Sequence, residues 1–214
     1  MCFGCNTPLG KGERILCTVC RHDLPLTDYN FIDENLIDRI FYGRVPIKKA
    51  NSLLFYAENG IVQQLIHYLK YKNQEAIGAF LGDWFGQQIK ANNQLPTIDF
   101  IVPVPLHRKR LKQRGYNQVQ LFAERLAHHL NTTVRTDILR KTKNTKTQTK
   151  KGRSLRWYKK TDLFILDNAA LIAHKRILLV DDVITTGATI EACATVLKHA
   201  KDVELYIATM AVVP

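Results

Sequence analysis

The sequence predicts an α/β protein with a mainly parallel sheet flanked by helices. Short apolar runs, typical of buried strands, alternate along the chain with longer segments of helical periodicity. Such alternation predicts crossover connections and therefore parallel strands. The 214 residues suffice for one sizeable core and a small appendage. Their 46% hydrophobic and 23% charged content is ordinary for a folded globular protein, which excludes wholesale disorder.

The pattern locates the expected elements in chain order. We expect strands at residues 52–56, 99–105, 176–180 and 203–213, and helices at residues 35–41, 60–72, 75–90, 116–130 and 188–200. The helix at 116–130 has the clearest periodicity, with Val119, Phe122, Leu126 and Leu130 on one face. Residues 107–114 and the Lys/Thr-rich stretch at 140–160 lack such periodicity, so we expect loops there.

The positive charge of the chain is local. The net charge is +12, yet residues 107–114 and 140–160 together carry 15 basic and no acidic residues. The rest of the chain therefore has a slight negative excess. Two acid-free runs of this kind suit a polyanion, although solvated surface loops are the simpler interpretation.

Residues 177–189, ILLVDDVITTGAT, combine the features of a ribose-phosphate site. Four apolar residues form a strand that leads the chain to the carboxyl end of the sheet, where open α/β folds bind ligands. Asp181 and Asp182 suit two vicinal hydroxyls or a divalent cation. Gly187, the threonine hydroxyls and a helix N-terminus suit a phosphate. Both the P-loop and the dinucleotide-binding glycine patterns are absent.

This segment resembles the motif by which type I phosphoribosyltransferases bind 5-phosphoribosyl-1-pyrophosphate (PRPP). Residues 102–118, VPVPLHRKRLKQRGYNQ, and the N-terminal cysteines extend the resemblance to the ComF family (competence protein F-like) over nearly the whole chain. It implies a type I phosphoribosyltransferase-like core, a hood region at about residues 52–95 and a small zinc-ribbon-like knuckle. It also implies a role in natural transformation, handling single-stranded DNA after uptake, with the DNA-uptake machinery as a candidate partner.

The resemblance also implies roles for individual residues. Asp181 and Asp182 would contact the ribose hydroxyls and are the candidate catalytic residues, with Mg²⁺ accompanying PRPP. The 5′-phosphate would be held by Thr185, Thr186, Gly187, Ala188 and Thr189. The basic run suits the pyrophosphate, because Arg pairs bidentately with phosphate oxygens, and the candidates there are Arg108, Arg110, Arg114 and Lys70. The neighbouring His107 either touches pyrophosphate, acts as an acid or base, or orients the loop by a hydrogen bond.

The four N-terminal cysteines form two CxxC pairs, Cys2 with Cys5 and Cys17 with Cys20. Four thiolates at this spacing suit a structural Zn²⁺ with a closed coordination shell. A redox CxxC is the rival interpretation, but neither pair lies on a βα turn, and a cytosolic setting disfavours disulfides. We expect Cys193, within the helix at 188–200, to be a buried small hydrophobe.

The second basic run carries the candidate DNA contacts. Cations beside aromatic rings suit the stacking of unpaired bases, and the candidates are Lys146, Lys150, Lys151, Arg153, Arg156 and Trp157. A hydrophobic anchor for a lid over the pyrophosphate is the competing interpretation of this stretch.

Three functions are compatible with these features. We expect a PRPP-binding, phosphoribosyltransferase-like protein that also engages single-stranded DNA, inclined towards catalysis with an acceptor that the sequence does not identify. The alternative is an active phosphoribosyltransferase of nucleotide metabolism with no direct DNA role. A PRPP-sensing transcription factor ranks last, because no DNA-reading motif is present.

The organisation expected along the chain has three parts: a zinc-binding segment at 1–24, a connector at 25–50 and a phosphoribosyltransferase-like domain at 51–214. No apolar run reaches the roughly 18–20 residues that span a bilayer. The N-terminus lacks the basic and apolar regions of a signal peptide. We therefore expect a cytoplasmic protein.

Overall fold

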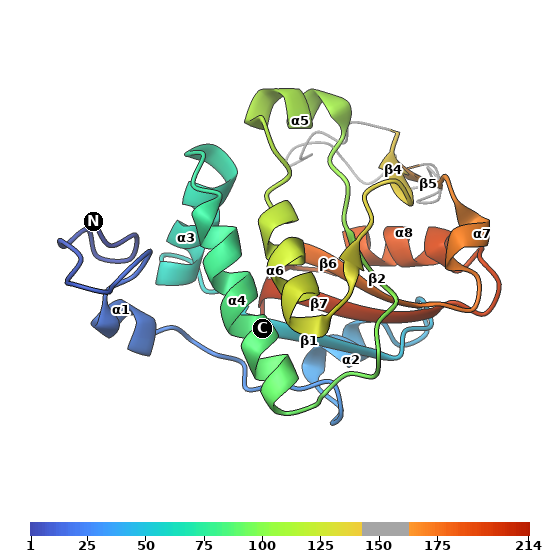
Figure 1. Cartoon of the computed structure of the whole chain (residues 1–214), viewed down its shortest axis with the longest axis horizontal. Coiled ribbons are helices and arrows are strands. Elements are labelled where there is room, and N and C mark those ends of the chain that lie inside the picture. The colour runs from blue at the N-terminus through green and yellow to red at the C-terminus, as the bar shows by residue number, and fades with distance from the viewer. Residues whose placement is uncertain (143–162) are drawn as a thin grey trace, which may run out of the picture.

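The structure is a computed structural model that describes residues 1–142 and 163–214 (Figure 1). The helices are α1 (Thr18–His22), α2 (Leu36–Ile40), α3 (Ile61–Tyr71), α4 (Ala76–Ala91), α5 (Arg108–Arg114), α6 (Gln120–Leu130), α7 (Ala169–Ile172) and α8 (Ala188–Leu197). The strands are β1 (Lys49–Phe55), β2 (Phe100–Pro103), β3 (Thr133–Val134), β4 (Leu139–Lys141), β5 (Phe164–Leu166), β6 (Arg176–Ile184) and β7 (Glu204–Val212).

Five strands form one parallel sheet in the order β1-β7-β6-β2-β3. The prediction of a parallel sheet flanked by helices is therefore confirmed. β4 and β5 form a separate antiparallel pair, on either side of residues 143–162 in the sequence. The central strand β6 has β7 on one side and β2 on the other.

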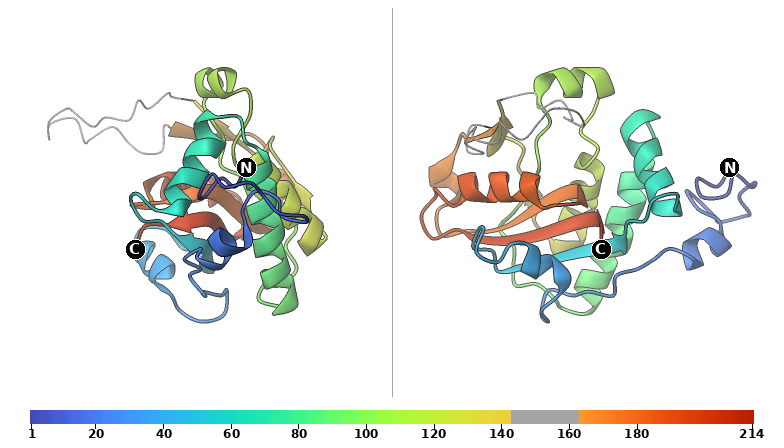
Figure 2. Two further views of the ribbon diagram at one scale, coloured as in Figure 1. Left: turned by 90° about the vertical axis from the view of Figure 1, so that its left-hand side faces the viewer. Right: turned by 180° about the vertical axis from the view of Figure 1, so that it is seen from behind.

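Two hydrophobic clusters cover the two faces of this sheet. α3, α4 and α6 pack on the face that carries Leu178 and Val180 of β6. α2 and α8 pack on the face that carries Ile177 and Leu179, and both helices lie in front of the sheet when it is seen from behind (Figure 2). Side chains of a strand alternate between faces, so this pattern determines where the residues after Val180 point.

α4 and α6 approach each other closely through glycines of α4. A Cβ atom on Gly82 would lie 2.8 Å from the carbonyl oxygen of Phe122, and one on Gly86 would lie 2.6 Å from Cδ2 of His129. Larger side chains at these two positions would push α6 away. Phe80 and Trp84 each lie two residues from Gly82, and therefore on a different side of α4.

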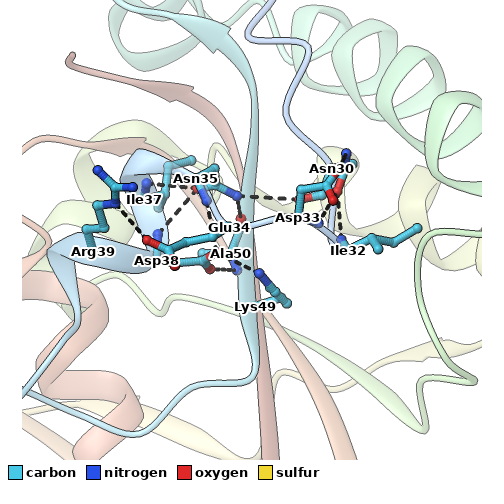
Figure 3. Close-up of polar contacts among 10 residues, drawn as sticks. All are labelled: Asn30, Ile32, Asp33, Glu34, Asn35, Ile37, Asp38, Arg39, Lys49 and Ala50. Carbon is cyan, nitrogen blue, oxygen red and sulfur yellow. Dashed lines mark hydrogen bonds and ion pairs between the residues drawn. The ribbon is translucent and has the colours of Figure 1, made fainter.

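Polar contacts attach the connector to the first strand (Figure 3). Asn35 caps α2 by accepting from the amide of Ile37 at 2.8 Å, and its Nδ2 donates to the carbonyl of Ala50 at 2.8 Å. Asp38 accepts from the amide of Ala50 at 2.8 Å and pairs with Lys49 at 3.1 Å. α2 is therefore fixed against the start of β1, and the expected boundary between residues 50 and 51 lies inside that strand.

The N-terminal cysteine segment, residues 1–24, lies on the α3–α4 side of the molecule, away from the sheet (Figure 1). Leu16, Cys20 and Leu24 are buried and belong to the same cluster as α3 and α4. Phe3 packs edge-on against Tyr68 of α3, with ring centroids 5.1 Å apart. The three-part division of the chain stays a prediction. Among the described helices, none is both long and apolar enough to cross a membrane.

Some expectations about the elements were wrong. The strand expected at 176–180 continues to Ile184, because β7 goes on pairing with it as far as Val212. The run at 107–114 is a helix, since Arg, Lys, Gln and Leu favour helices and Gly115 ends α5 in the left-handed conformation. The helix expected from residue 116 begins at Gln120, because the Asn117 side chain is held by the carbonyl of Val104 at 3.1 Å.

Candidate functional site at the carboxyl end of β6

The candidate site begins where β2 leaves the sheet. β2 pairs with β6 as far as Val180, whose carbonyl accepts from the amide of Val104 at 2.9 Å. Beyond Val180, β6 continues with only β7 paired beside it among the described residues. Asp181 and Asp182 thus lie at the open carboxyl end of the sheet, where parallel α/β folds bind ligands.

The two carboxylates point to opposite faces of β6, because they continue its alternation. Asp182 lies on the α3–α6 face and is buried. Its carboxylate pairs with Lys70 Nζ at 2.9 Å and accepts from Nε2 of Gln118 at 2.8 Å. Gln118 in turn accepts from Arg114 at 2.8 Å. This network brings together three residues predicted from the sequence, and Gln118 is the link that the prediction missed.

A pocket of about 440 Å³ adjoins this network. Lys70, Arg110 and Arg114 line it together with Tyr71, over whose ring the Arg114 guanidinium lies at 5.3 Å. Three of the four cations predicted to face a pyrophosphate therefore surround one hollow. Arg108 is exposed on α5 and does not line it.

His107 caps the helix that carries these arginines. Its Nδ1 accepts from the amide of Lys109 at 3.2 Å, which is the N-cap bond of α5. This is the loop-orienting hydrogen bond expected as one role of His107, and a contact with pyrophosphate stays a prediction. The Tyr116 hydroxyl donates to the carbonyl of Leu69 and so fixes the chain after α5 against the end of α3.

Asp181 lies on the other face and is also buried. Burial raises its pKa to about 7, the nearby charge of Asp182 acts in the same direction, and the charges of Lys70 and Lys141 oppose the shift. Burial lowers the pKa of Lys141 in its turn. Lys141 ends β4, shortly before residues 143–162. The sequence marked it only as one of many cations in a basic run, so its charge interaction with Asp181 was missed.

The turn after β6 is held by the connector. Thr185, Thr186 and Thr189 are exposed, whereas Gly187 is buried. Arg44 donates to the carbonyl of Thr186 at 2.8 Å and pairs with Glu191 of α8 at 2.5 Å. The connector thus supports the threonine-rich turn and the start of α8, a role for Arg44 that nothing in the local sequence indicated.

Gly187 is required by both its backbone and its neighbours. Its φ is +73°, and an added Cβ would lie 2.7 Å from Cγ2 of Ile40. We expect Gly187→Ala to lower the free energy of unfolding by about 2 kcal/mol, since the left-handed conformation alone costs about 1 kcal/mol. Urea unfolding measures this loss. Gly43→Ala is the matched control, because Gly43 has a φ of +69° with nothing within 4 Å. Equal losses in the two variants would contradict the role of the Ile40 contact.

The four N-terminal cysteines converge as the spacing predicted. Their sulfur atoms lie within 4.8 Å of one another. The amides of Gly4 and Cys17 both donate to Cys2 Sγ at 3.3 Å, and the amide of Cys20 donates to Cys17 Sγ at 3.5 Å. Four sulfurs with amide donors suit a closed tetrahedral Zn²⁺ site.

The protonation of the cluster differs from thiol to thiol. Burial acts to raise the pKa of Cys2, but hydrogen bonds from the backbone outweigh it and lower that pKa to about 6. Burial raises the pKa of Cys20 far above its usual range. Cys193 lies apart in α8, buried in the second cluster as expected of a small hydrophobe.

The predicted DNA contacts fall outside the described residues. These are Lys146, Lys150, Lys151, Arg153, Arg156 and Trp157.

Comparison with known proteins identifies related sequences. Residues 120–213 match the phosphoribosyl transferase domain family, a range that includes the threonine-rich turn. The chain is 32% identical over 208 residues to the DNA utilization protein YhgH of Salmonella typhi, and the alignment covers 92% of this chain and 90% of that protein. It is 33% identical over 144 residues to competence protein F of Haemophilus influenzae, covering 63% and 60%.

A more distant relative covers as much of the chain. Competence protein ComFC of Bacillus subtilis is 27% identical over 202 residues, covering 92% of this chain and 77% of its own. Among solved structures, adenine phosphoribosyltransferase of Saccharomyces cerevisiae is 22% identical, covers 66% of this chain and 72% of its own, and has a TM-score of 0.41.

Proposed function

The chain belongs to the ComF family of phosphoribosyltransferase-like proteins, and we propose that it binds PRPP at the carboxyl end of β6 and acts on single-stranded DNA during its uptake or use. One observation carries the PRPP assignment: the pocket lined by Lys70, Arg110 and Arg114 is joined to Asp182 by the Lys70 ion pair at 2.9 Å. Cations for a pyrophosphate and carboxylates for ribose hydroxyls are thus adjacent.

PRPP fits this arrangement in one direction. Its 5′-phosphate goes to the turn at Thr185–Thr189, where exposed hydroxyls and the N-terminus of α8 suit an anion. Its ribose hydroxyls go to Asp181 and Asp182, and its pyrophosphate goes to the Lys70 pocket. Mg²⁺ bound with PRPP supplies further positive charge to the phosphate oxygens. When the ribose hydroxyls engage Asp182, Lys70 is released from its ion pair towards the pyrophosphate.

Phosphoribosyl transfer is the reaction that this arrangement favours. An acceptor forms a bond to the anomeric carbon while the bond to pyrophosphate breaks, and pyrophosphate leaves with the electron pair. The three cations stabilise the charge on the leaving group. A ligand site does not by itself fix a reaction. An enzyme of nucleotide metabolism without a DNA role is the alternative, and it requires pyrophosphate release with an acceptor but no affinity for DNA.

The DNA assignment rests on the relatives and on charge. Two relatives are named for competence and another for DNA utilization. The chain has a net charge of +12, and positive surfaces supply most of the affinity for a phosphate backbone. We place the protein in the cytoplasm, with a structural Zn²⁺ on the four N-terminal cysteines.

Thermal unfolding with PRPP tests the ligand assignment. At about 100 times its dissociation constant, a ligand adds about 2.7 kcal/mol, which raises the Tm of a chain of this size by roughly 5–10 °C. We expect that shift with PRPP and Mg²⁺, a smaller one with PRPP alone, and none in Asp182→Asn. Glu58→Gln, an exposed carboxylate in the loop before α3, is the control and keeps the shift. A full shift in Asp182→Asn would exclude this site.

A further inference from the structure

A second hollow is lined by residues between Lys11 and Arg21 of the N-terminal cysteine segment, by α4 and by Arg125 of α6. Figure 1 shows that this N-terminal segment lies on the α3–α4 side of the molecule. We call the hollow the cysteine-segment groove. Its volume is about 710 Å³, larger than the pocket at Lys70. The two hollows share no lining residue, so PRPP binding at β6 leaves this groove unexplained.

Two aromatic rings in edge-to-face contact, with an interplanar angle of 76°, and a guanidinium lie together in this groove. Phe80 and Trp84 are four residues apart and therefore share one face of α4, and their ring centroids lie 5.9 Å apart. The Arg21 guanidinium lies 4.9 Å from the centroid of the Trp84 ring and 5.9 Å from that of Phe80. Because Arg21 is exposed, another flat, electron-rich group can stack from solvent on the guanidinium that lies over Trp84.

The acidic side chains of the groove are already engaged. The Glu13 carboxylate accepts from the amides of Gly10 and Thr18 and from the Thr18 hydroxyl, at 2.6–2.7 Å. Asp83 accepts from Arg125 Nε at 3.1 Å and contacts Nε2 of His129 at 3.1 Å. Both carboxylates therefore serve to hold the fold together.

The cations of the groove are not balanced in the same way. Lys11, Arg14 and Arg21 are exposed and line it, and none of them forms an ion pair with another described residue. The groove therefore has more basic than acidic side chains, with Lys11, Arg14 and Arg21 exposed near the two aromatic rings.

We propose that the cysteine-segment groove binds single-stranded nucleic acid, with an unpaired base stacked on the Arg21–Trp84 pair and the backbone phosphates on Lys11 and Arg14. Aromatic platforms combined with cations that follow a backbone are the usual means of binding single strands. In a duplex the bases are paired and stacked, and their faces do not reach such a platform. An acidic peptide would use the cations but would place no flat group on the Arg21–Trp84 pair.

This assignment also gives the cysteine cluster a part in binding. Arg21 directly follows Cys20 in α1, whose N-cap is Cys17. The cluster therefore determines where the Arg21 guanidinium lies over the ring of Trp84. The inference rests on the proposed DNA function, and it locates the strand away from the PRPP pocket.

Fluorescence anisotropy with a labelled oligothymidylate of about 16 nucleotides tests the groove. We expect Trp84→Leu to weaken binding about tenfold, which is the size of one lost base stack, and Trp84→Phe to retain most of the affinity. Arg21→Gln should weaken binding by a similar factor, because it removes the other member of the stacking pair. Arg21 is exposed, so this variant keeps the fold even if Trp84→Leu does not.

Lys90→Gln is the matched control for charge. Lys90 is an exposed cation in the last turn of α4 and does not line the groove, so its loss should leave the affinity unchanged. All four variants should keep the Tm increase with PRPP and Mg²⁺, which shows that the β6 site is intact.

Intrinsic fluorescence supplies an independent measurement. The chain has two tryptophans, so Trp157→Phe leaves Trp84 as the only one, and its emission should be quenched by oligothymidylate. Wild-type affinity in both Trp84→Leu and Arg21→Gln would exclude the groove as the DNA-binding site, although the protein would still bind DNA. Failure of the unaltered protein to bind DNA would overturn both, with the PRPP result unaffected. Quenching by polyglutamate in place of oligothymidylate would assign the groove to an acidic peptide.

Discussion

Replacing Asp181 by asparagine is expected to stabilise the ligand-free protein at pH 8 and to abolish its stabilisation by PRPP. Asp181 is buried, and burial together with the charge of Asp182 raises its pKa to about 7 from an ordinary value of 3.8. A buried carboxylate that must ionise at neutral pH destabilises the fold. Such a residue is typical of a functional site, where stability is reduced in favour of ligand binding.

The sign of the pH dependence is set by proton binding. The folded state binds the proton of Asp181 more tightly than the unfolded state does, so stability falls as the pH rises from about 4 to about 7. Each pKa unit corresponds to about 1.4 kcal/mol, and a shift of about three units sets an upper limit of about 4 kcal/mol. An asparagine has no proton to lose, so Asp181→Asn should show no such fall.

Urea unfolding between pH 4 and pH 8 measures this difference. We expect Asp181→Asn and the unaltered protein to differ little at pH 4 and to diverge as the pH rises, with the variant more stable at pH 8. Glu58→Gln removes an exposed carboxylate and should match the unaltered protein. If the free energies of unfolding of Asp181→Asn and the unaltered protein changed in parallel with pH, ionisation of Asp181 would not destabilise the fold. Retention of the PRPP-induced Tm increase would separately exclude Asp181 from the ligand site.

The sequence was sufficient to predict a mainly parallel sheet and the position of the acids, but not the short strand β3 at its edge. Four apolar residues before Asp181 indicated a strand buried on both faces, and a buried strand of a parallel sheet leads to the ligand-binding edge. The spacing of the four cysteines likewise predicted their convergence, because each CxxC pair is local. In both cases the information lies within a few consecutive residues.

The contacts that hold the site residues in place could not be predicted in this way, because they join residues that are far apart in the sequence. Gln118 reaches Asp182 across 64 residues of sequence, and Arg44 reaches Glu191 across 147. α5 was missed for a different reason: a short, highly charged helix with no buried residue has no apolar periodicity to detect. The glycines of α4 gave no signal either, since only the approach of α6 explains Gly82.

If the four N-terminal cysteines hold Zn²⁺ as we propose, replacing Cys20 by serine is expected to abolish its binding and to lower the Tm by more than about 10 °C. Cys20 is one of the four converging sulfurs and is buried. A structural zinc contributes about 10–16 kcal/mol to small zinc-dependent folds, and a closed site does not tolerate the loss of a ligand. Because Leu16 and Leu24 pack in the same cluster as α3 and α4, unfolding of this segment exposes part of the main core.

Elemental analysis and thermal unfolding test this expectation together. The unaltered protein should carry about one zinc per chain, and Cys20→Ser should carry little. Cys193→Ala is the matched control, because Cys193 is equally buried but lies in α8, in the other cluster. It should keep its zinc and lose only a few degrees of Tm, as for a small cavity. A Cys20→Ser protein with undiminished zinc and Tm would exclude the four-cysteine site.

Removal of the proposed zinc by a chelator is also expected to weaken DNA binding, because Arg21 follows Cys20 in α1. Without the metal, α1 is no longer held in place and the Arg21 guanidinium loses its contact with the Trp84 ring. A chelator should therefore weaken oligothymidylate binding about as much as Arg21→Gln does. Lys70, Asp182 and Gln118 belong to α3, β6 and the segment before α6 and should still respond to PRPP at temperatures below the lowered Tm. Equal loss of both ligands would show instead that the cysteine segment supports the whole core and has no separate part in binding.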